Sequence, residues 1–83
     1  MSSLQNSLIA SYIYMDETHL KDVLSIEKNS YGYPWSEKIF NDCLTNNYLC
    51  RVLKLDNTLI GFLISSIIQD ECHIMNLCID SKY

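Results

Sequence analysis

The chain has 83 residues, which fits one small domain, since single domains usually run to about 100–150 residues. Hydrophobic residues make up 48% of it and charged residues 19%, which excludes a disordered segment, because disorder needs fewer apolar residues and more charge. Six basic against ten acidic side chains give a net charge of −4, which argues against a dedicated binder of nucleic acid or anionic membrane, since such proteins carry a basic patch.

The first part of the chain predicts a strand followed by a helix. Residues 8–15 are rich in Ile and Tyr and contain no Gly or Pro, which is typical of a strand. Asp16 and Thr18 then offer N-caps for a helix, with His19 in its first turn. The side chains that recur at helical spacing behind them are Leu20, Val23, Leu24 and Glu27.

A loop and a second helix follow. Residues 29–34 hold the only Pro and one of the two Gly of the chain, which predicts a loop. Ser36 is the expected N-cap, and Glu37 complements the helix dipole. Trp35 is placed to pack on Phe40 as a hydrophobic staple. The stripe expected to be buried is Ile39, Phe40, Cys43 and Leu44.

The second half of the chain predicts three strands. Residues 48–55 and 58–68 are strand-like runs separated by Asp56-Asn57, two residues that suit a tight hairpin. After a turn at residues 69–71, residues 72–80 form the last run. The order β-α-α-β-β-β predicts an α+β fold, with two helices packed on an antiparallel four-stranded sheet.

In the run 58–68, the residues that point to one face of the strand and those that point to the other are both apolar. We therefore expect this strand to be covered on both faces. The side chains assigned to one face are Ile60, Phe62, Ile64 and Ile68, and those assigned to the other are Leu59, Leu63 and Ile67.

The four cysteines allow three disulfide pairings on paper: they are Cys43, Cys50, Cys72 and Cys78. None sits in a CxxC motif and their neighbours are apolar, so we expect reduced cysteines packed as small hydrophobes. A zinc site built from Cys72, His73 and Cys78 is disfavoured, because adjacent strand residues point to opposite faces. No metal is therefore expected, and neither His73 nor His19 has a partner at a diagnostic spacing.

The chain is expected to be cytoplasmic. No apolar run approaches the roughly 20 residues of a membrane span, and the first residues lack the basic and apolar regions of a signal peptide.

Four short segments carry a family resemblance. They are Ile26-Glu27 in the first helix, residues 33–38 (YPWSEK), residues 60–62 (IGF) and residues 76–80 (NLCID). The PWSEKxF stretch is the most specific, whereas IGF alone would mean little. Together they resemble the N-terminal half of a GNAT-type acetyltransferase, and most closely the bacterial family that acetylates the N-terminal alanine of a ribosomal protein. The resemblance runs over nearly the whole chain, roughly residues 9–83.

The resemblance implies a site for acetyl-CoA on the last strand. Leu77, Cys78 and Ile79 match the strand whose backbone, in the family, hydrogen-bonds the pantetheine arm and polarises the thioester carbonyl. A bulged or splayed strand has unpaired backbone groups with which an extended ligand can pair. The alternative is an ordinary hydrophobic sheet strand.

The resemblance also implies an acceptor site in the loop between the helices. Tyr31, Tyr33 and Trp35 match the region that helps to form the acceptor-peptide groove, although the staple alone would explain Trp35. Glu27 would pair with the incoming amine or take its proton, and the alternative is a solvated surface carboxylate.

The resemblance finally implies direct transfer from acetyl-CoA to the amine of an acceptor protein, a ribosomal protein in this family, without a metal. The pyrophosphate loop and the acid and base residues of the family lie beyond the position matched by Tyr83, so residues 1–83 are expected to form a partial domain without catalytic residues, inactive alone. The chain is expected to self-associate as a homo-oligomer through the exposed edge strand 72–80, and the alternative function is a non-catalytic interaction fragment that acts through this same edge.

Overall fold

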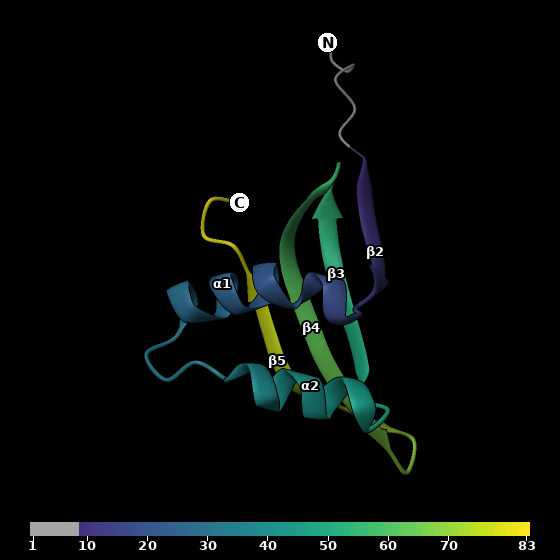
Figure 1. The fold of residues 1–83 in the computed structure, drawn as a ribbon. Helices are drawn as coiled ribbons and strands as arrows, with labels where there is room; N and C mark the ends of the chain where they lie inside the picture. The colour runs from purple at the N-terminus through teal and green to yellow at the C-terminus, as the bar shows by residue number, and fades with distance from the viewer. Residues whose placement is uncertain (1–8) are drawn as a thin grey trace.

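Four antiparallel strands form one sheet with two helices lying across one of its faces (Figure 1). This arrangement comes from a computed structural model that describes residues 9–83. The elements are β2 (Ala10–Tyr14), the short 3₁₀ turn η1 (Glu17–His19), α1 (Leu20–Ser30), α2 (Glu37–Thr45), β3 (Leu49–Leu55), β4 (Thr58–Ile68) and β5 (Glu71–Ile79). The predicted fold class and element order are confirmed, while Leu8 of the first predicted strand lies outside the described residues.

Predicted caps precede both helices: Asp16 caps the 3₁₀ turn η1, which runs directly into α1, and Ser36 caps α2. The Asp16 side chain accepts from the Thr18 backbone N–H (2.9 Å), and the His19 ring accepts from the Asp16 backbone N–H (3.0 Å). The Asp16 side chain and the His19 ring together form a capping box at the start of η1, which gives the His19 ring a structural role in the turn. Ser36 caps α2 by accepting from the Ile39 backbone N–H (3.3 Å). Since α1 continues to Ser30, the loop begins later than predicted, at residue 31.

The hydrophobic core lies between the helices and the sheet. Phe40 is fully buried, with its ring 5.3 Å from that of Trp35 and edge-on to Phe62 at 5.5 Å. This contact confirms the predicted staple. Ile39, however, is 41% exposed, so the predicted stripe was too wide: only Phe40 and Cys43 of α2 are fully inside the core.

Two β-bulges change which side chains share a face. Between β3 and β4, Leu53 pairs with Gly61 and Lys54 with Leu59, which leaves Ile60 as an extra residue. Because an extra residue inverts the alternation, Leu59 joins Phe62 and Ile64 in the core, and its predicted assignment to the opposite face was wrong. On β5, Met75 is the extra residue, since Ile64 pairs with Asn76 and Ser65 with Ile74.

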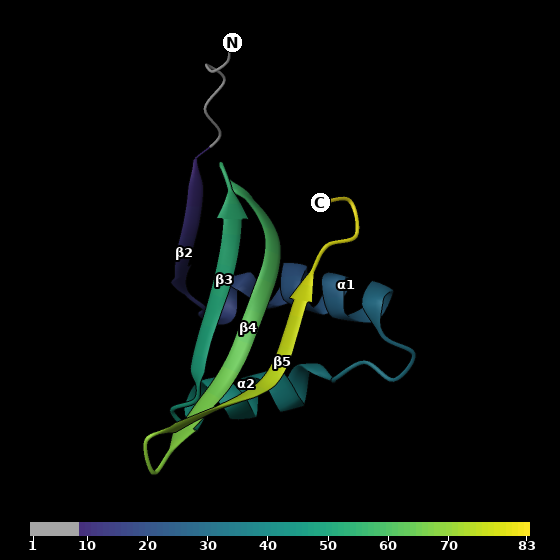
Figure 2. The same cartoon turned by 180° about the vertical axis from the view of Figure 1, so that it is seen from behind.

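The other face of the sheet carries no helix within residues 9–83, as the view from behind shows (Figure 2). The expectation that β4 is covered on both faces is therefore not met within this part of the chain. Leu63 is half-buried there by its strand neighbours Arg51 and Leu77, and Ile67 is exposed. Neither helix is long and apolar enough to cross a bilayer in the portion of the chain that the structure describes.

The four cysteines are free, with Cys72 exposed and Cys43, Cys50 and Cys78 buried. Burial raises the pKa of Cys50 to about 11 and also raises the pKa of Cys43. Since the thiolate is the nucleophile, we expect iodoacetamide near neutral pH to label Cys72 alone in the folded protein and all four thiols in denaturant, counted by intact mass. Rapid labelling of Cys50 in the native state, or a disulfide in stoichiometric amount, would contradict this packing.

Candidate functional site

An open groove of about 550 Å³ lies between the α1–α2 loop and β5. It brings together five residues that the sequence singled out, which are Glu27, Tyr31, Tyr33, Trp35 and Leu77. Gly32 and three β5 residues, Ile74, Met75 and Asn76, complete its lining. The topology explains this meeting, because α1 ends over β5 and the loop that leaves α1 follows the same strand (Figure 1).

Glu27 is buried at the C-terminal end of α1, with 2% of its surface exposed. The Trp35 backbone N–H donates to Glu27 Oε2 (2.8 Å), and the Asn76 side-chain amide donates to Oε1 (2.9 Å). The alternative of a solvated surface carboxylate was therefore wrong. Each carboxylate oxygen instead accepts a hydrogen bond from the protein, one from the loop and one from β5.

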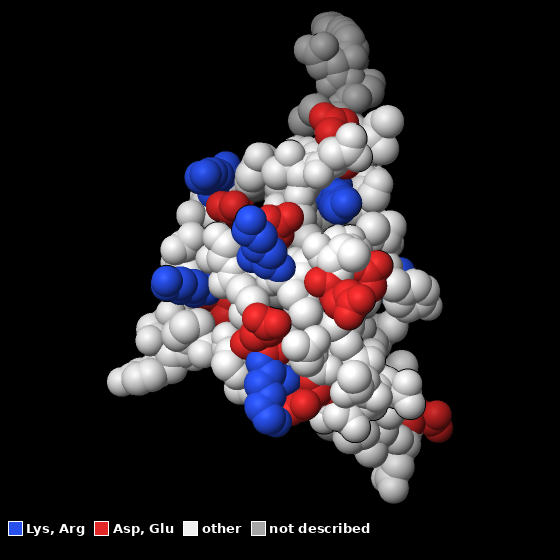
Figure 3. Space-filling view, in the orientation of Figure 1, with Lys and Arg blue, Asp and Glu red and all other residues white. Residues whose placement is uncertain are grey.

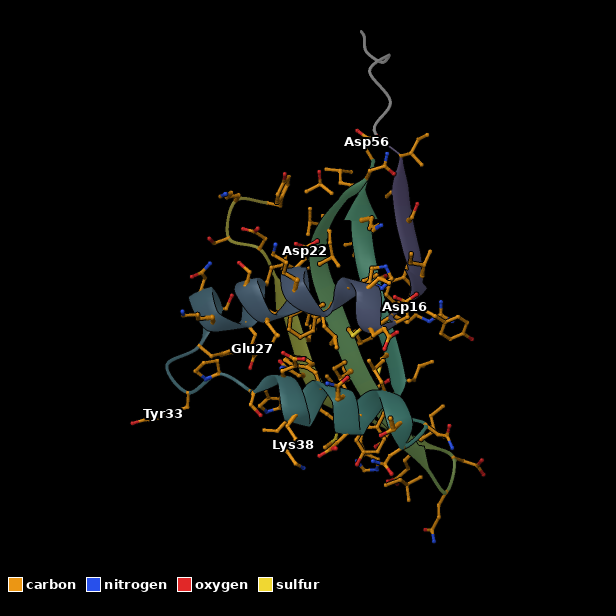
Figure 4. All side chains as sticks on the ribbon, viewed as in Figure 1. Asp16, Asp22, Glu27, Tyr33, Lys38 and Asp56 are labelled. Carbon is orange, nitrogen blue, oxygen red and sulfur yellow. The ribbon has the colours of Figure 1, made fainter. Side chains whose placement is uncertain are left out.

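The three aromatic residues of the loop differ in their contacts. The Tyr31 hydroxyl donates to the Leu77 backbone carbonyl (2.9 Å). Desolvation, together with the nearby Cys78 and Glu27, raises the pKa of Tyr31, so this hydroxyl keeps its proton at neutral pH. Tyr33 is 98% exposed and points away from the body of the molecule (Figure 4). Trp35 contributes both to the groove and to the staple.

The outer edge of β5 has backbone groups that β4 does not use. The Asp80 N–H donates to the Ile60 carbonyl of β4, and alternate residues of an antiparallel strand direct their backbone groups to opposite sides. The N–H and C=O groups of Leu77 and Ile79 therefore point away from β4. Cys78 points its backbone toward β4 and its side chain into the core, so it differs from its two predicted partners.

Charge around this groove is sparse. Among the described residues, Glu27 is the one charged member of its lining. On the helix-covered face, basic and acidic side chains are interspersed rather than gathered by sign (Figure 3). Within residues 9–83, no three His, Cys, Asp or Glu side chains come together as metal ligands would.

Comparison with known proteins finds bacterial N-acetyltransferases that this chain resembles in sequence and in fold. The chain is 29% identical over 69 residues to the [ribosomal protein bS18]-alanine N-acetyltransferases of Escherichia coli K12 and Salmonella typhimurium, a match that covers 83% of this chain and 47% of either relative. The crystal structure of the ribosomal-protein-S18-alanine N-acetyltransferase from Escherichia coli matches with a TM-score of 0.81 and 27% identity, over 90% of this chain and 48% of that one. In sequence and in fold, the chain resembles the N-terminal half of a GNAT-type acetyltransferase.

The acetyltransferase resemblance rests on these relatives, since no family model matches the chain. The chain spans about half the length of the curated relatives it matches.

The sequence alone did not point to one polar contact at the groove, that of the Asn76 side chain. Asn76 was noted only within the family-like segment, yet it is the β5 donor to the buried Glu27. The signal for this contact is a polar side chain at a core-facing position of an apolar strand, because a buried amide needs a hydrogen-bond partner.

Proposed function

We propose that this chain supplies the acceptor groove and the thioester-binding strand edge of a cytoplasmic, acetyl-CoA-dependent N-acetyltransferase whose acceptor is the N-terminal alanine of a ribosomal protein. The observation that carries the proposal is the groove between the α1–α2 loop and the free outer edge of β5, in a chain that matches the Escherichia coli enzyme at a TM-score of 0.81.

The strand edge fits an extended, amide-bearing ligand. The outward N–H groups of Leu77 and Ile79 and the carbonyl of Ile79 lie in the arrangement with which an added strand pairs, and the pantetheine arm of acetyl-CoA is such a ligand. The co-substrate supplies the acetyl group when bound. A backbone N–H directed at the thioester oxygen would stabilise negative charge developing there, and the proposed transfer needs no metal.

The groove beside this edge fits the acceptor. Tyr31, Tyr33 and Trp35 supply aromatic surface, and Glu27 lines the floor. An acceptor N-terminus lying in the groove would run alongside Leu77, so its amine would approach a thioester held at the β5 edge. Holding two reactants in this way removes much of the entropic cost of bringing them together.

Binding of acetyl-CoA tests this proposal directly. Titration into the ¹⁵N-labelled chain is expected to shift the amide resonances of Leu77 and Ile79 more than those of Phe62 and Ile64, which lie in the interior strand β4. Saturable shifts confined to the β5 edge would support the proposal. An absence of shifts at millimolar acetyl-CoA, or shifts centred on β2, would contradict it.

We expect negligible acetyl transfer by the polypeptide of residues 1–83 when it is assayed alone. Its described residues present binding groups but no acid–base pair beside the β5 edge, since Glu27 is held by two protein donors. The assay is release of CoA thiol in the presence of acetyl-CoA and an Ala-starting peptide. Turnover at rates normal for enzymes, about 1–10³ per second, would refute the expectation.

A second candidate function is a non-catalytic module that self-associates through β5. The exposed apolar side chains of Leu77, Ile79 and Ile74 favour it, together with the unpaired backbone groups beside them. Sedimentation at micromolar concentration is then expected to show a homo-oligomer, and Leu77→Lys is expected to restore the monomer. The matched control is Ile39→Lys, which places the same charge on an exposed apolar position of the helix layer. A wild-type monomer would exclude this candidate.

A further inference from the structure

The buried carboxylate of Glu27 is the feature of this molecule that packing alone explains least. It is 2% exposed, and no Lys, Arg or His forms an ion pair with it within residues 9–83. Burying an ionised carboxylate without compensation is costly, and a well-packed apolar side chain in such a place is often equally stable. We therefore expect the Glu27 carboxylate to have a role that an apolar side chain could not take.

The two donors to Glu27 belong to segments that are far apart in the sequence. Trp35 lies eight residues after Glu27 and Asn76 lies 49 residues after it. A carboxylate that accepts from a loop backbone and from a strand side chain at once fixes the distance between them. We infer that Glu27 is a positioning residue, whose carboxylate holds the α1–α2 loop at a set distance from β5 and so determines the width of the groove.

The rest of the loop has little else to hold it in place. A methyl group added at Gly32 would meet nothing within 4 Å, and Tyr33 is almost fully exposed. Before Gly32 and Tyr33, the Tyr31 hydroxyl donates a hydrogen bond to the Leu77 carbonyl. On the other side, the backbone of Trp35 is tied to Glu27. Loss of the Glu27 bond would leave the backbone at the Trp35 end without its hydrogen bond to α1, and that end would be held only through the packing of Trp35 on Phe40.

The inference gives the acceptor site a preformed shape, and in this respect it rests on the proposed function. A loop held in its binding conformation before the ligand arrives loses less conformational entropy on binding. The expected ligand is an extended peptide N-terminus, narrow enough to lie between the aromatic loop and the β5 edge. Glu27 acts on such a ligand through the loop rather than by touching the reacting amine.

The first test is the variant Glu27→Gln, which keeps the shape of the side chain. A glutamine has one acceptor oxygen, so it accepts from the Trp35 N–H without a clash only when Asn76 turns its own amide over to accept from the new N–H₂, and otherwise it places that N–H₂ against a donor. We expect the Trp35 amide to exchange its proton about tenfold faster, the loss equivalent to one net hydrogen bond. The control is Glu71→Gln, which removes an exposed carboxylate at the start of β5 and is expected to leave the exchange rate unchanged.

The second test is the double variant Glu27→Gln with Asn76→Asp. In this variant residue 27 donates to residue 76, whereas in the wild type residue 76 donates to residue 27. The side-chain N–H₂ introduced at position 27 donates to the new carboxylate at position 76, and the amide oxygen at position 27 accepts from the Trp35 N–H. We expect protection of the Trp35 amide to return toward the wild-type rate. The single variant Asn76→Asp brings two carboxylates together in a buried site and is expected to be the worst of the set.

The third test measures peptide affinity through the fluorescence of Trp35, which is the only Trp in the chain. The probe is a hexapeptide beginning with Ala. Glu27→Gln is expected to weaken its affinity about tenfold, and the double variant is expected to restore it. Restoration by the exchanged pair distinguishes positioning from a requirement for a charge at residue 27.

These outcomes separate the inference from the proposed function. A faster Trp35 exchange that the double variant corrects, in a wild-type chain that does not bind the peptide, upholds the positioning role and refutes the acceptor site. Unchanged exchange in Glu27→Gln, or a double variant as fast as the single one, overturns the inference. Should Glu27→Gln fail to fold, Asn76→Ala removes the β5 donor alone, and an unaltered Trp35 exchange rate in that variant also overturns it.

Discussion

Replacement of Phe40 by alanine is expected to lower the free energy of unfolding by about 3–5 kcal/mol, the usual cost of removing a buried Phe side chain. Phe40 is fully buried and its ring contacts both Trp35 and Phe62, so the change empties the centre of the hydrophobic core that the described residues form between helices and sheet. The free energy of unfolding of a natural domain is about 5–15 kcal/mol in total, and small domains lie low in that range. Urea unfolding followed by circular dichroism is therefore expected to show a variant with little stability left, whose transition begins at or near zero urea.

The control for this variant is Tyr33→Ala, which removes an aromatic ring of similar size from a position that is 98% exposed. Surface substitutions of this kind usually change stability by less than about 0.5 kcal/mol. A loss below about 1 kcal/mol for Phe40→Ala, or similar losses for both variants, would contradict the description of the core.

Replacement of Gly61 by alanine is expected to cost about 1–3 kcal/mol, as overpacking does in a filled site. A Cβ atom there would lie 2.5 Å from Ile79 Cδ1 and 2.8 Å from the Cys78 carbonyl oxygen. The Ile79 side chain is able to turn away, but the carbonyl belongs to the strand itself. The end of β5 must therefore move from β4. Urea unfolding measures the cost, and the Ile79 amide resonance reports the displacement at the proposed ligand edge.

Gly32→Ala is the matched control for Gly61→Ala. The same methyl group at residue 32 meets nothing within 4 Å, and the backbone there does not need a positive φ. Because alanine restricts the unfolded chain, this variant is expected to be neutral or slightly more stable. Equal effects of the two substitutions would show that β4 and β5 are not packed as described.

Features with a local signal were predicted from the sequence. Ser36 caps α2 and Asp56-Asn57 turns the β3–β4 hairpin because the residues that decide each feature lie within a few positions of it. The turn before β5 was placed one residue too long: it is formed by Gln69-Asp70, both with positive φ. Asp tolerates that conformation readily, and the composition of the segment does not fix its length.

Features that depend on distant partners were not predicted. The bulge residues Ile60 and Met75 are apolar residues in apolar strands, so nothing in their neighbourhood marks them as extra. The role of Glu27 depends on Asn76, 49 residues away. The resemblance to an acetyltransferase pointed to the residues that line the groove. The two donors to the Glu27 carboxylate became visible only in the three-dimensional structure.

The place of β2 in the sheet has a consequence for the order in which the chain folds. The strands β3, β4 and β5 are joined by two short turns, so each finds its partner by closing a loop of two residues. Ala10 pairs with Leu55 only after both helices have been brought back across the sheet, and the closure entropy of a loop grows with its length. We therefore expect the three-stranded meander to form first, at small entropic cost, and α1 and α2 to dock on it. By the same argument β2 is expected to be the last strand to pair and the first to separate.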